Sequence, residues 1–482
     1  MTTRPNKSDS TRQKQWAPKV RTGCQTCRAR RIKCDETQPH CTKCVKRGLS
    51  CQYTLRFRPV ARDRPLAPAP TQAQAPLAQA EPPMWHFMEA IRYYCAFVRP
   101  IRVAQEGTHD IPDPPFHTGD VISARFICQI IGHQALTLSR RRGSAISFWE
   151  ERQFASMRRN YSRYFIEFLN IVNSCLRSGI SGGGTAKAFH HLWILLSFDL
   201  SLKEKLWPVH VSGALAYAQL LGGPKAALSL PGPPIFFRQM VLHAIVSNAT
   251  SPVAQQIKGH GGYTDEEIKA VLTDEESTRP FPVDLVVVVK HITDIRVQAT
   301  FQTGNLRALQ HRMQLVLQRI DMFDPDAWAK ELEFYSEDAT SAIGQIFQIA
   351  TRLYGILALP VSVTAPALAA AYPGVASASA SGLGSAYDSL RVSQRTQLVE
   401  RLRDTWPLMP QISNMSWPLL VAGVALADGS WEDRDFVADC LDRIWKQPMG
   451  DISPLMGLEK LQQFWKSGKR GWEDCFDEPV PR

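Results

Sequence analysis

The 482-residue chain lacks the features that would place it in a membrane or in a common enzyme class. No run of about 18 apolar residues occurs, so we expect no membrane span. The first twenty residues contain no apolar stretch of a secretory signal, which favours a reducing compartment. None of the histidines most worth testing belongs to an HExxH, GxSxG or phosphate-loop pattern: His190, His191, His210 and His260. We therefore predict that the chain is not an enzyme.

The N-terminal segment from Cys24 to Cys51 has too few apolar residues to form a core. Only Ile32, Val45 and Leu49 stand out among its 28 residues. Its cysteines repeat the pattern Cys-x2-Cys-x6-Cys twice, at Cys24, Cys27, Cys34, Cys41, Cys44 and Cys51. Either disulfides or metal must hold such a segment together. Zinc fits better than disulfides, because thiolates are its preferred structural ligands and nothing indicates secretion.

The number of thiols indicates how many zinc ions the segment binds. One tetrahedral zinc needs four ligands and would leave two of the six thiols unused. Two ions are fully coordinated by six thiolates if two of the sulfurs bridge both metals. Because the two halves repeat, we predict that the leading cysteine of each, Cys24 and Cys41, is the bridge. His40 adjoins Cys41, but with six thiolates sufficient we interpret it as an exposed connector residue.

Basic residues are concentrated around these cysteines. Residues 1–64 contain 17 Lys and Arg against 4 Asp and Glu, whereas the remainder contains 39 against 41. Four cations stand between Cys27 and Cys34, and on a helix they would cover most of the exposed surface: Arg28, Arg30, Arg31 and Lys33. Three more follow in the second half, where Gly48 would end a helix early: Lys43, Lys46 and Arg47. Charge placed in this way predicts a nucleic-acid interface.

The cysteine spacing, with Arg28 after the second cysteine and Pro39 in the connector, resembles the fungal Zn2Cys6 (binuclear zinc-cluster) transcription factors. The resemblance implies that the first half forms a short helix that enters the major groove and reads a CGG triplet. It places Arg31 where the family more often has a base-reading lysine, next to Arg30 with a carbonyl facing the bases. By the same resemblance Arg28 and Lys33 contact phosphate, and we expect the second half to support the phosphates.

Four regions follow from composition. We predict a disordered basic arm at 1–18, the zinc domain at 19–54, a stiff linker at 55–83 and one all-α domain at 84–482. Residues 59–83 include seven prolines and seven alanines, with no heptad repeat for a coiled coil. The chain therefore either binds a half-site as a monomer or forms a homodimer through its large domain. The basic arm or the Arg28–Lys33 cluster is a candidate nuclear import signal.

Apolar residues at spacings of three and four predict the helices of the large domain. We expect helices at Met84–Arg99 (ended by Pro100), Val121–Leu138, Arg152–Gly179, Ala186–Leu202, Ile235–Asn248, Leu306–Met322, Ala327–Leu359, Leu390–Trp406 and after a capping box at Ser430-x-x-Asp433. Asp284–Lys290 is compatible with a strand or with the start of a buried helix, and Thr364–Ser389 is interpreted as a mobile loop. The remaining cysteines are expected to be small core residues, with redox sensing as the alternative: Cys95, Cys128, Cys175, Cys440 and Cys475.

Scattered motifs of the large domain resemble the regulatory region of the branch that includes the fungal sterol-responsive regulators. They are Trp207-x2-His210-x2-Gly213-Ala214, Trp417–Gly423 and the closing Phe464-Trp465, Gly471-Trp472 and Cys475-Phe476. The resemblance implies a domain that senses a small molecule or recruits partners, such as the transcription machinery or co-regulators, and restrains the activator. We expect a nuclear regulator of metabolic, including secondary-metabolite, genes that binds double-stranded DNA with CGG half-sites. The rival hypothesis is a zinc-stabilised interaction or scaffold protein.

Overall fold

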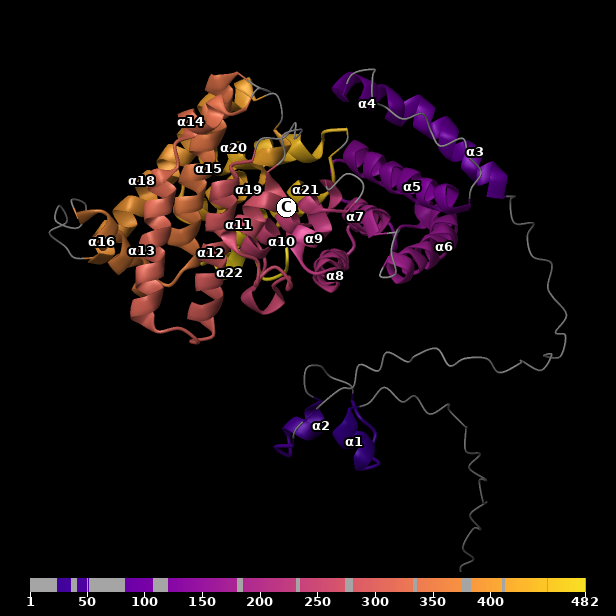
Figure 1. Cartoon of the computed structure of the whole chain (residues 1–482), viewed down its shortest axis with the longest axis horizontal. Helices are drawn as coiled ribbons and strands as arrows, with labels where there is room; N and C mark the ends of the chain where they lie inside the picture. Colours follow the sequence, from indigo (N-terminus) through magenta and orange to yellow (C-terminus); the bar gives the residue numbers. More distant parts are fainter. Residues whose placement is uncertain are drawn as a thin grey trace, which may run out of the picture. The chain divides into compact units, whose positions relative to one another are not determined.

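The protein was analysed as a computed structural model, in which the chain divides into two compact units, 1–79 and 80–482, each described by itself. The described residues are 24–35, 41–49, 51, 83–106, 120–179, 185–230, 235–273, 281–332, 336–373, 383–409, 412–448 and 450–481. All regular elements in these ranges are helices (Figure 1), which confirms the predicted mostly-α class. The basic arm, His40 and residues 52–82, which include all of the predicted linker except Pro83, lie outside these ranges.

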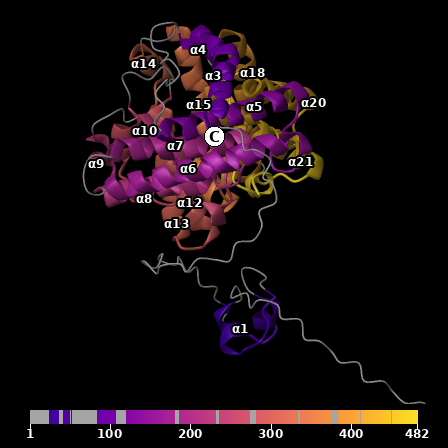
Figure 2. The ribbon, with the colours of Figure 1, turned by 90° about the vertical axis from the view of Figure 1, so that its right-hand side faces the viewer.

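The small unit contains two short helices, α1 (Gln25–Ala29) and α2 (Thr42–Val45). The large unit is built from α3 (Pro83–Tyr93), α4 (Arg99–Glu106), α5 (Asp120–Arg142), α6 (Ala155–Gly179), α7 (Thr185–Leu202), α8 (Trp207–Leu220), α9 (Pro224–Leu228), α10 (Ile235–Ala249), α11 (Asp265–Leu272), α12 (Val283–Thr300), α13 (Leu306–Met322), α14 (Pro325–Lys330), α15 (Glu337–Ala358), α16 (Val361–Ala371), α18 (Leu383–Thr405), α19 (Ser416–Ala425), α20 (Trp431–Trp445), α21 (Ser453–Ser467) and α22 (Trp472–Cys475). Helices adjacent in sequence generally pack on one another, as α6, α7 and α8 do (Figure 2).

The centre of the large unit is formed by helices that are buried over much of their length. In α10 all residues from Met240 to Ala249 are buried, and in α12 the four consecutive valines are buried as well. The segment Asp284–Lys290 is therefore a helix start and not a strand. Helix α12 packs on α10 and on α15, and α15 packs on α19, so apolar residues occupy most of the buried positions of these helices.

A buried arginine joins this centre to the C-terminal helix. The guanidinium of Arg296 donates to the carbonyl oxygens of Ala249 at 2.8 Å and Asn248 at 3.2 Å, where α10 ends. It also donates to the hydroxyl of Tyr354 at 3.2 Å. The indole Nε1 of Trp472 donates to the same Ala249 oxygen at 2.8 Å. These donors satisfy carbonyls that a helix end leaves without intrahelical partners, and they fix α22 against α10.

Pro100 does not end the first helix of the large unit, contrary to the prediction. Tyr94–Val98 forms a π-helical turn, in which the N–H of Arg99 donates to the carbonyl oxygen of Tyr94. The helix then continues to Glu106. The π turn shifts the hydrogen-bond ladder just before Pro100, so the missing N–H of proline falls in the first turn of a new segment.

The predicted single helix at Ala327–Leu359 is in fact two helices, α14 and α15. The side chain of Asp324 accepts from the N–H of Asp326 and Ala327, and the side chain of Ser336 accepts from Ala339. Each side chain caps a new helix start. The capping of α20 by Ser430, whose side chain accepts from Asp433 at 3.1 Å, is as predicted.

Both ends of the predicted mobile loop, Thr364–Ser389, belong to helices. Residues Thr364–Ala371 form most of α16, and α18 begins at Leu383. Val363 and Leu368 are buried where α16 packs on α13. Alanine has the highest helix propensity, so an alanine-rich stretch with buried apolar residues extends a helix. Residues 374–382 lie outside the described ranges.

Candidate metal centre and nucleic-acid interface

Each half of the small unit has a hydrogen bond from its backbone to one of its own cysteine sulfurs. The backbone N–H of Cys27 donates to the sulfur of Cys24 at 3.3 Å, and the N–H of Cys41 donates to the sulfur of Cys51 at 3.2 Å. Five of the six thiols are buried, and Cys34 is partly buried. With Ile32, Val45 and Leu49 exposed, these sulfurs are the only hydrophobic cluster among the described residues of this unit.

The six thiols form two groups of four whose sulfur atoms all lie within 4.8 Å of one another. One group contains Cys24, Cys27, Cys34 and Cys41, and the other contains Cys24, Cys41, Cys44 and Cys51. The two groups share Cys24 and Cys41, the pair predicted to bridge. The Cys24–Cys41 and Cys27–Cys41 sulfurs are 3.8 and 3.6 Å apart. Sulfurs 2.3 Å from a tetrahedral zinc would be about 3.8 Å apart, so these groups fit zinc.

The two halves end their helices in the same way, although one uses arginine and the other glycine. Gly48 has φ 59° and Arg31 has φ 56°, both in the left-handed region. The N–H of Leu49 donates to the backbone carbonyl oxygen of Cys44 at 3.1 Å, and the N–H of Ile32 donates to that of Cys27 at 3.0 Å. These are the long-range bonds of a helix terminus closed by a left-handed residue. Arg31 therefore occupies a position that normally favours glycine.

The predicted helix carrying all four cations of the first half is therefore wrong in its length. Helix α1 ends at Ala29, so Arg30 and Arg31 lie in the closing turn and Lys33 follows it. Of these side chains, Arg31 and Lys33 are exposed and Arg30 is partly buried. The backbone of Arg28 lies in α1, but its side chain lies outside the described part of the structure.

In the second half, Lys46 and Arg47 are exposed beyond α2. The ammonium of Lys43 donates to the backbone carbonyl oxygen of Lys33 at 2.8 Å. Lys43 therefore joins the two halves beside the cluster. The sequence does not predict this contact, because it predicts that Lys43 supports the phosphates with the other cations of the second half. The repeat gives no signal for it, because the 17-residue offset places Lys43 in register with Thr26 and not with Lys33.

The histidines of the large unit do not form a metal site among the described residues, where all groups of donors close enough for a metal are cysteines of the small unit. The rings of His190 and His191 are 5.9 Å apart and nearly parallel. Burial lowers the pKa of both side chains, and that of His260, to about 4, so they are neutral at pH 7. His210 lies 3.2 Å from the carboxylate of Asp199.

The other cysteines mostly match the expectation of small core residues. Cys128, Cys440 and Cys475 are buried, Cys175 is partly buried and Cys95 is exposed. Burial raises the pKa of the Cys440 thiol to about 12, which keeps it protonated.

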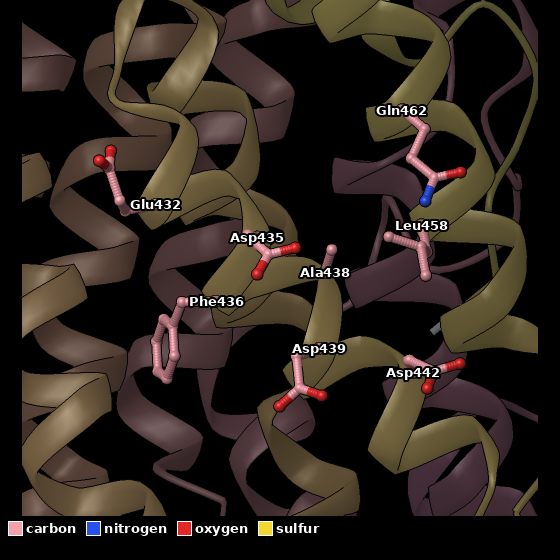
Figure 3. A pocket seen from close by; sticks show the side chains of 8 residues that line it. All are labelled: Glu432, Asp435, Phe436, Ala438, Asp439, Asp442, Leu458 and Gln462. Carbon is pink, nitrogen blue, oxygen red and sulfur yellow. The ribbon is translucent and has the colours of Figure 1, made fainter.

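An open pocket of about 460 Å³ lies between α20 and α21 (Figure 3). Its lining includes carboxylates along α20 and Leu458 and Gln462 from α21. Asp439 pairs with Arg443 of the same helix at 2.8 Å, and Asp442 pairs with Lys446, the residue after the helix, at 2.5 Å. Carboxylates paired in this way form a solvated helix surface, and none of the lining residues is a nucleophile next to a base. No described helix has the length and apolar character to cross a membrane.

The thiol cluster and the large helical unit together define a zinc-cluster transcription regulator. Residues 22–59 match the fungal Zn(2)-Cys(6) binuclear cluster domain, and residues 152–479 match the fungal specific transcription factor domain. Since the second match covers more than half of the chain, this chain belongs to the fungal Zn2Cys6 transcription factors. Its cluster domain binds two zinc ions, and Cys24 and Cys41 belong to both groups of four thiols that would hold them.

One similar protein extends over almost the whole chain. It is the phomenoic acid biosynthesis cluster-specific transcriptional regulator of Leptosphaeria maculans, which is 23% identical over 95% of this chain and 88% of its own length. The aflatoxin biosynthesis regulatory protein of Aspergillus flavus is 38% identical over 14% of each chain. Sterol uptake control protein 2 of Saccharomyces cerevisiae is 47% identical over 9% of this chain and 5% of its own length. No solved structure shows a significant match.

Proposed function

We propose that this chain binds CGG-containing duplex DNA in the nucleus and regulates RNA polymerase II transcription of a secondary-metabolite gene cluster. The observation that carries the proposal is the two-metal thiol cluster with an exposed arginine at the turn that closes its first helix. The regulators of phomenoic acid and aflatoxin biosynthesis support the choice of pathway class. Transcription machinery or co-regulators are the expected partners of the large unit.

In this proposal all six cysteines are the zinc ligands, with Cys27 and Cys34 on one ion and Cys44 and Cys51 on the other. The rigid cluster then positions α1, so that Arg31 projects from its C-terminal turn toward a guanine. An arginine fork matches the O6 and N7 acceptors of guanine, the commonest base-specific contact. Arg30 follows the same turn, and its backbone carbonyl faces the bases. A cation at this turn should contribute more to sequence specificity than a cation elsewhere, since the rigid cluster fixes the direction of its side chain.

The other cations would contact the DNA backbone. Arg28, Lys33, Lys46 and Arg47 are proposed to bind phosphates, which position a protein on the duplex without reading its sequence. Lys43 has a modified role, because its bond to the Lys33 carbonyl orients the segment after α1. The proposal includes the domain limits 19–54, 55–83 and 84–482. It also includes the binding of two chains together to paired half-sites.

The test compares a base-reading residue with a phosphate-binding one. Arg31→Ala should weaken binding to a CGG duplex by about 5- to 150-fold, corresponding to about 1–3 kcal/mol, and should barely affect a scrambled duplex. Lys46→Ala, the matched control, should weaken both duplexes alike and lower the slope of log K against log salt by about 0.9. Fluorescence anisotropy over a salt series measures both quantities.

A different result would favour the zinc-stabilised interaction protein. If Arg30→Ala and Arg31→Ala both leave the preference for CGG unchanged, the groove-helix hypothesis is wrong. If wild-type binding to DNA also shows no salt dependence, the basic cluster serves a protein partner instead.

A further inference from the structure

Helix α8 has an apolar surface that the described residues of its unit do not cover. The helix contains no Asp, Glu, Lys or Arg over Trp207–Leu220. One side packs into the core through Trp207, Val211, Ala214, Leu215, Tyr217 and Ala218. A helix that is apolar all round is normally buried all round. In the described structure α8 instead lies at the surface of the large unit, beside α7 (Figure 2).

The outward side of α8 forms a single apolar stripe. Its members follow one another at spacings of three, four, three and four residues: Leu206, Val209, Gly213, Ala216 and Leu220. All five are exposed, and the large side chains expose 58% (Leu206), 62% (Val209) and 74% (Leu220) of their surface. This spacing is the a/d repeat by which one helix packs along another. The stripe therefore has the pattern of a helix–helix contact that lacks its second helix.

No contact among the described residues of the unit requires a glycine at position 213, in the middle of the stripe. A Cβ added there would meet no atom within 4 Å. By contrast, a Cβ at Gly355, Gly423 or Gly457, also inside helices, would come within 3.0 Å of a neighbouring side chain. Glycine in a helix interior is unfavourable relative to alanine, so an unneeded one requires an explanation. A small residue flanked by larger ones allows the backbone of another helix to approach closely.

The stripe is self-complementary. Leu206 and Leu220 lie seven residues before and after Gly213, so an antiparallel copy centred on Gly213 places each leucine opposite the other. Val209 then lies within one residue, about 1.5 Å along the helix axis, of Ala216 of the copy, a larger side chain beside a smaller one. The stripe itself contains no charge that would oppose pairing.

We propose that two copies of this chain pair in antiparallel fashion through α8, on a two-fold axis next to Gly213. A C2 contact of this kind uses the same patch on both copies. One helix pair provides less surface than the 1,200–2,000 Å² typical of stable interfaces, so the expected dimer is reversible. This surface would serve the pairing invoked in the proposed function, but its test uses no DNA, so the two proposals fail separately.

The first experiment measures the oligomeric state of the full chain by sedimentation velocity over a concentration series. Wild type should show a monomer–dimer equilibrium, and Val209→Asp should raise the dissociation constant at least tenfold with an unchanged far-UV circular dichroism spectrum. Val361→Asp is the matched control, because Val361 is a half-exposed valine on another helix. It should leave the equilibrium unchanged.

The second experiment tests the axis and does not depend on a destabilising charge. Gly213→Cys places two thiols side by side on the proposed axis, so mild oxidation should produce a covalent dimer on a non-reducing gel. Gln219→Cys is exposed on the same helix, but its two thiols would be about 18 Å apart along the axis and should not cross-link. Wild type controls for the exposed Cys95.

The proposal is overturned if the wild-type chain stays monomeric over the whole series. It is also overturned if a dimer forms that Val209→Asp does not weaken and Gly213→Cys does not trap, since that dimer uses another surface. A monomer in which Val209→Asp or Gly213→Cys lowers the melting temperature would show that the same chain covers the stripe, which equally contradicts the inference.

Discussion

Arg31 has two properties that rarely occur in one residue: a left-handed backbone and a long cationic side chain. Its backbone closes α1 in the left-handed conformation, which the second half of the repeat assigns to Gly48. A non-glycine residue in this region costs about 1 kcal/mol relative to glycine. The first half therefore keeps a long cation at the tip of the turn despite backbone strain. The retained strain favours a role for the Arg31 side chain outside the small unit.

We expect Arg31→Gly to separate these two properties. The variant should retain zinc against a competing chelator at least as well as wild type, because the backbone strain is relieved. Its preference for a CGG duplex over a scrambled one should nevertheless fall by about 5- to 150-fold. Zinc retention and anisotropy, measured on the same preparation, test both effects.

Gly48→Ala is the reciprocal control. A Cβ at Gly48 would meet nothing within 4 Å, so only the backbone is affected, by about 1 kcal/mol. This variant should bind zinc less well while its CGG preference is kept. If Arg31→Gly keeps full CGG preference, the side chain of Arg31 does not read bases.

At the scale of elements, α19 and α21 approach closely because each has a glycine where the other has a leucine. A Cβ at Gly423 would collide with Leu461, and one at Gly457 would lie 2.6 Å from Leu420. Both leucines are buried, so they have little room to move. The indole of Trp465 also donates to the Gly423 carbonyl oxygen at 2.8 Å, which fixes the separation of the helices.

Gly457→Ala should therefore destabilise the large unit by about 1–3 kcal/mol through overpacking, although alanine is the better helix former. Gly213→Ala is the matched control, because its Cβ meets nothing and the variant should be neutral or more stable by up to about 1 kcal/mol. Urea unfolding of both variants at low protein concentration gives the comparison. Equal effects of the two substitutions would contradict the close packing of α19 on α21.

A carboxylate links α18 to the turn after α19. Asp428 accepts from Arg391 at 2.6 and 3.1 Å and from Arg395 at 2.6 Å. The Arg391 guanidinium, with help from Arg395 and Arg470, holds the pKa of Asp428 below its usual range. Because the folded pKa is the lower one, the contribution to stability is present above the unfolded pKa of about 4 and is lost as the pH falls further.

Asp428→Asn should thus lower the free energy of unfolding by about 1 kcal/mol between pH 5 and 8, after allowance for solvent screening. The difference from wild type should shrink below about pH 4. Asp388→Asn is the control, since Asp388 is 69% exposed and lies 3.8 Å from Arg391, and should change stability by less than about 0.5 kcal/mol. A loss of stability by Asp428→Asn that persists unchanged at pH 3 would argue against this linkage.

The sequence predicted the helical class and the thiol groups because both depend on local spacing. Apolar periodicity located α13 at both of its ends, and the repeat of the cysteines identified Cys24 and Cys41 as the shared pair. The errors fall where an adjustment in space overrides a local signal. In the sequence, Pro100 predicts a helix end, because the π turn before it cannot be recognised there. The left-handed backbone of Arg31 has one indication in the sequence, namely that Arg31 occupies the repeat position that Gly48 occupies in the second half. The exposed stripe of α8 was equally hidden, since apolar periodicity does not say which face lacks a neighbour.

At the scale of the whole molecule, the two units are stabilised by different means. The large unit buries an apolar core that runs through most of its helices, whereas the described residues of the small unit bury sulfur and almost nothing else. Net charge divides along the same line, with +13 in residues 1–64 and −2 in the rest of the chain. The affinity for DNA should therefore depend on zinc, and the helical fold should not.

The bridging thiols make this dependence testable by counting metal. Cys24→Ala removes a ligand from both ions, so the chain should lose both zincs and all CGG binding. Cys51→Ala removes a ligand from one ion only and leaves the group of Cys24, Cys27, Cys34 and Cys41 complete, so about one zinc should remain. Elemental analysis gives these numbers. Far-UV circular dichroism should stay unchanged in both variants, because α1 and α2 contribute only five and four helical residues. Equal zinc content in the two variants would contradict a shared sulfur at Cys24, and loss of the helical signal would show that the large unit depends on the metal as well.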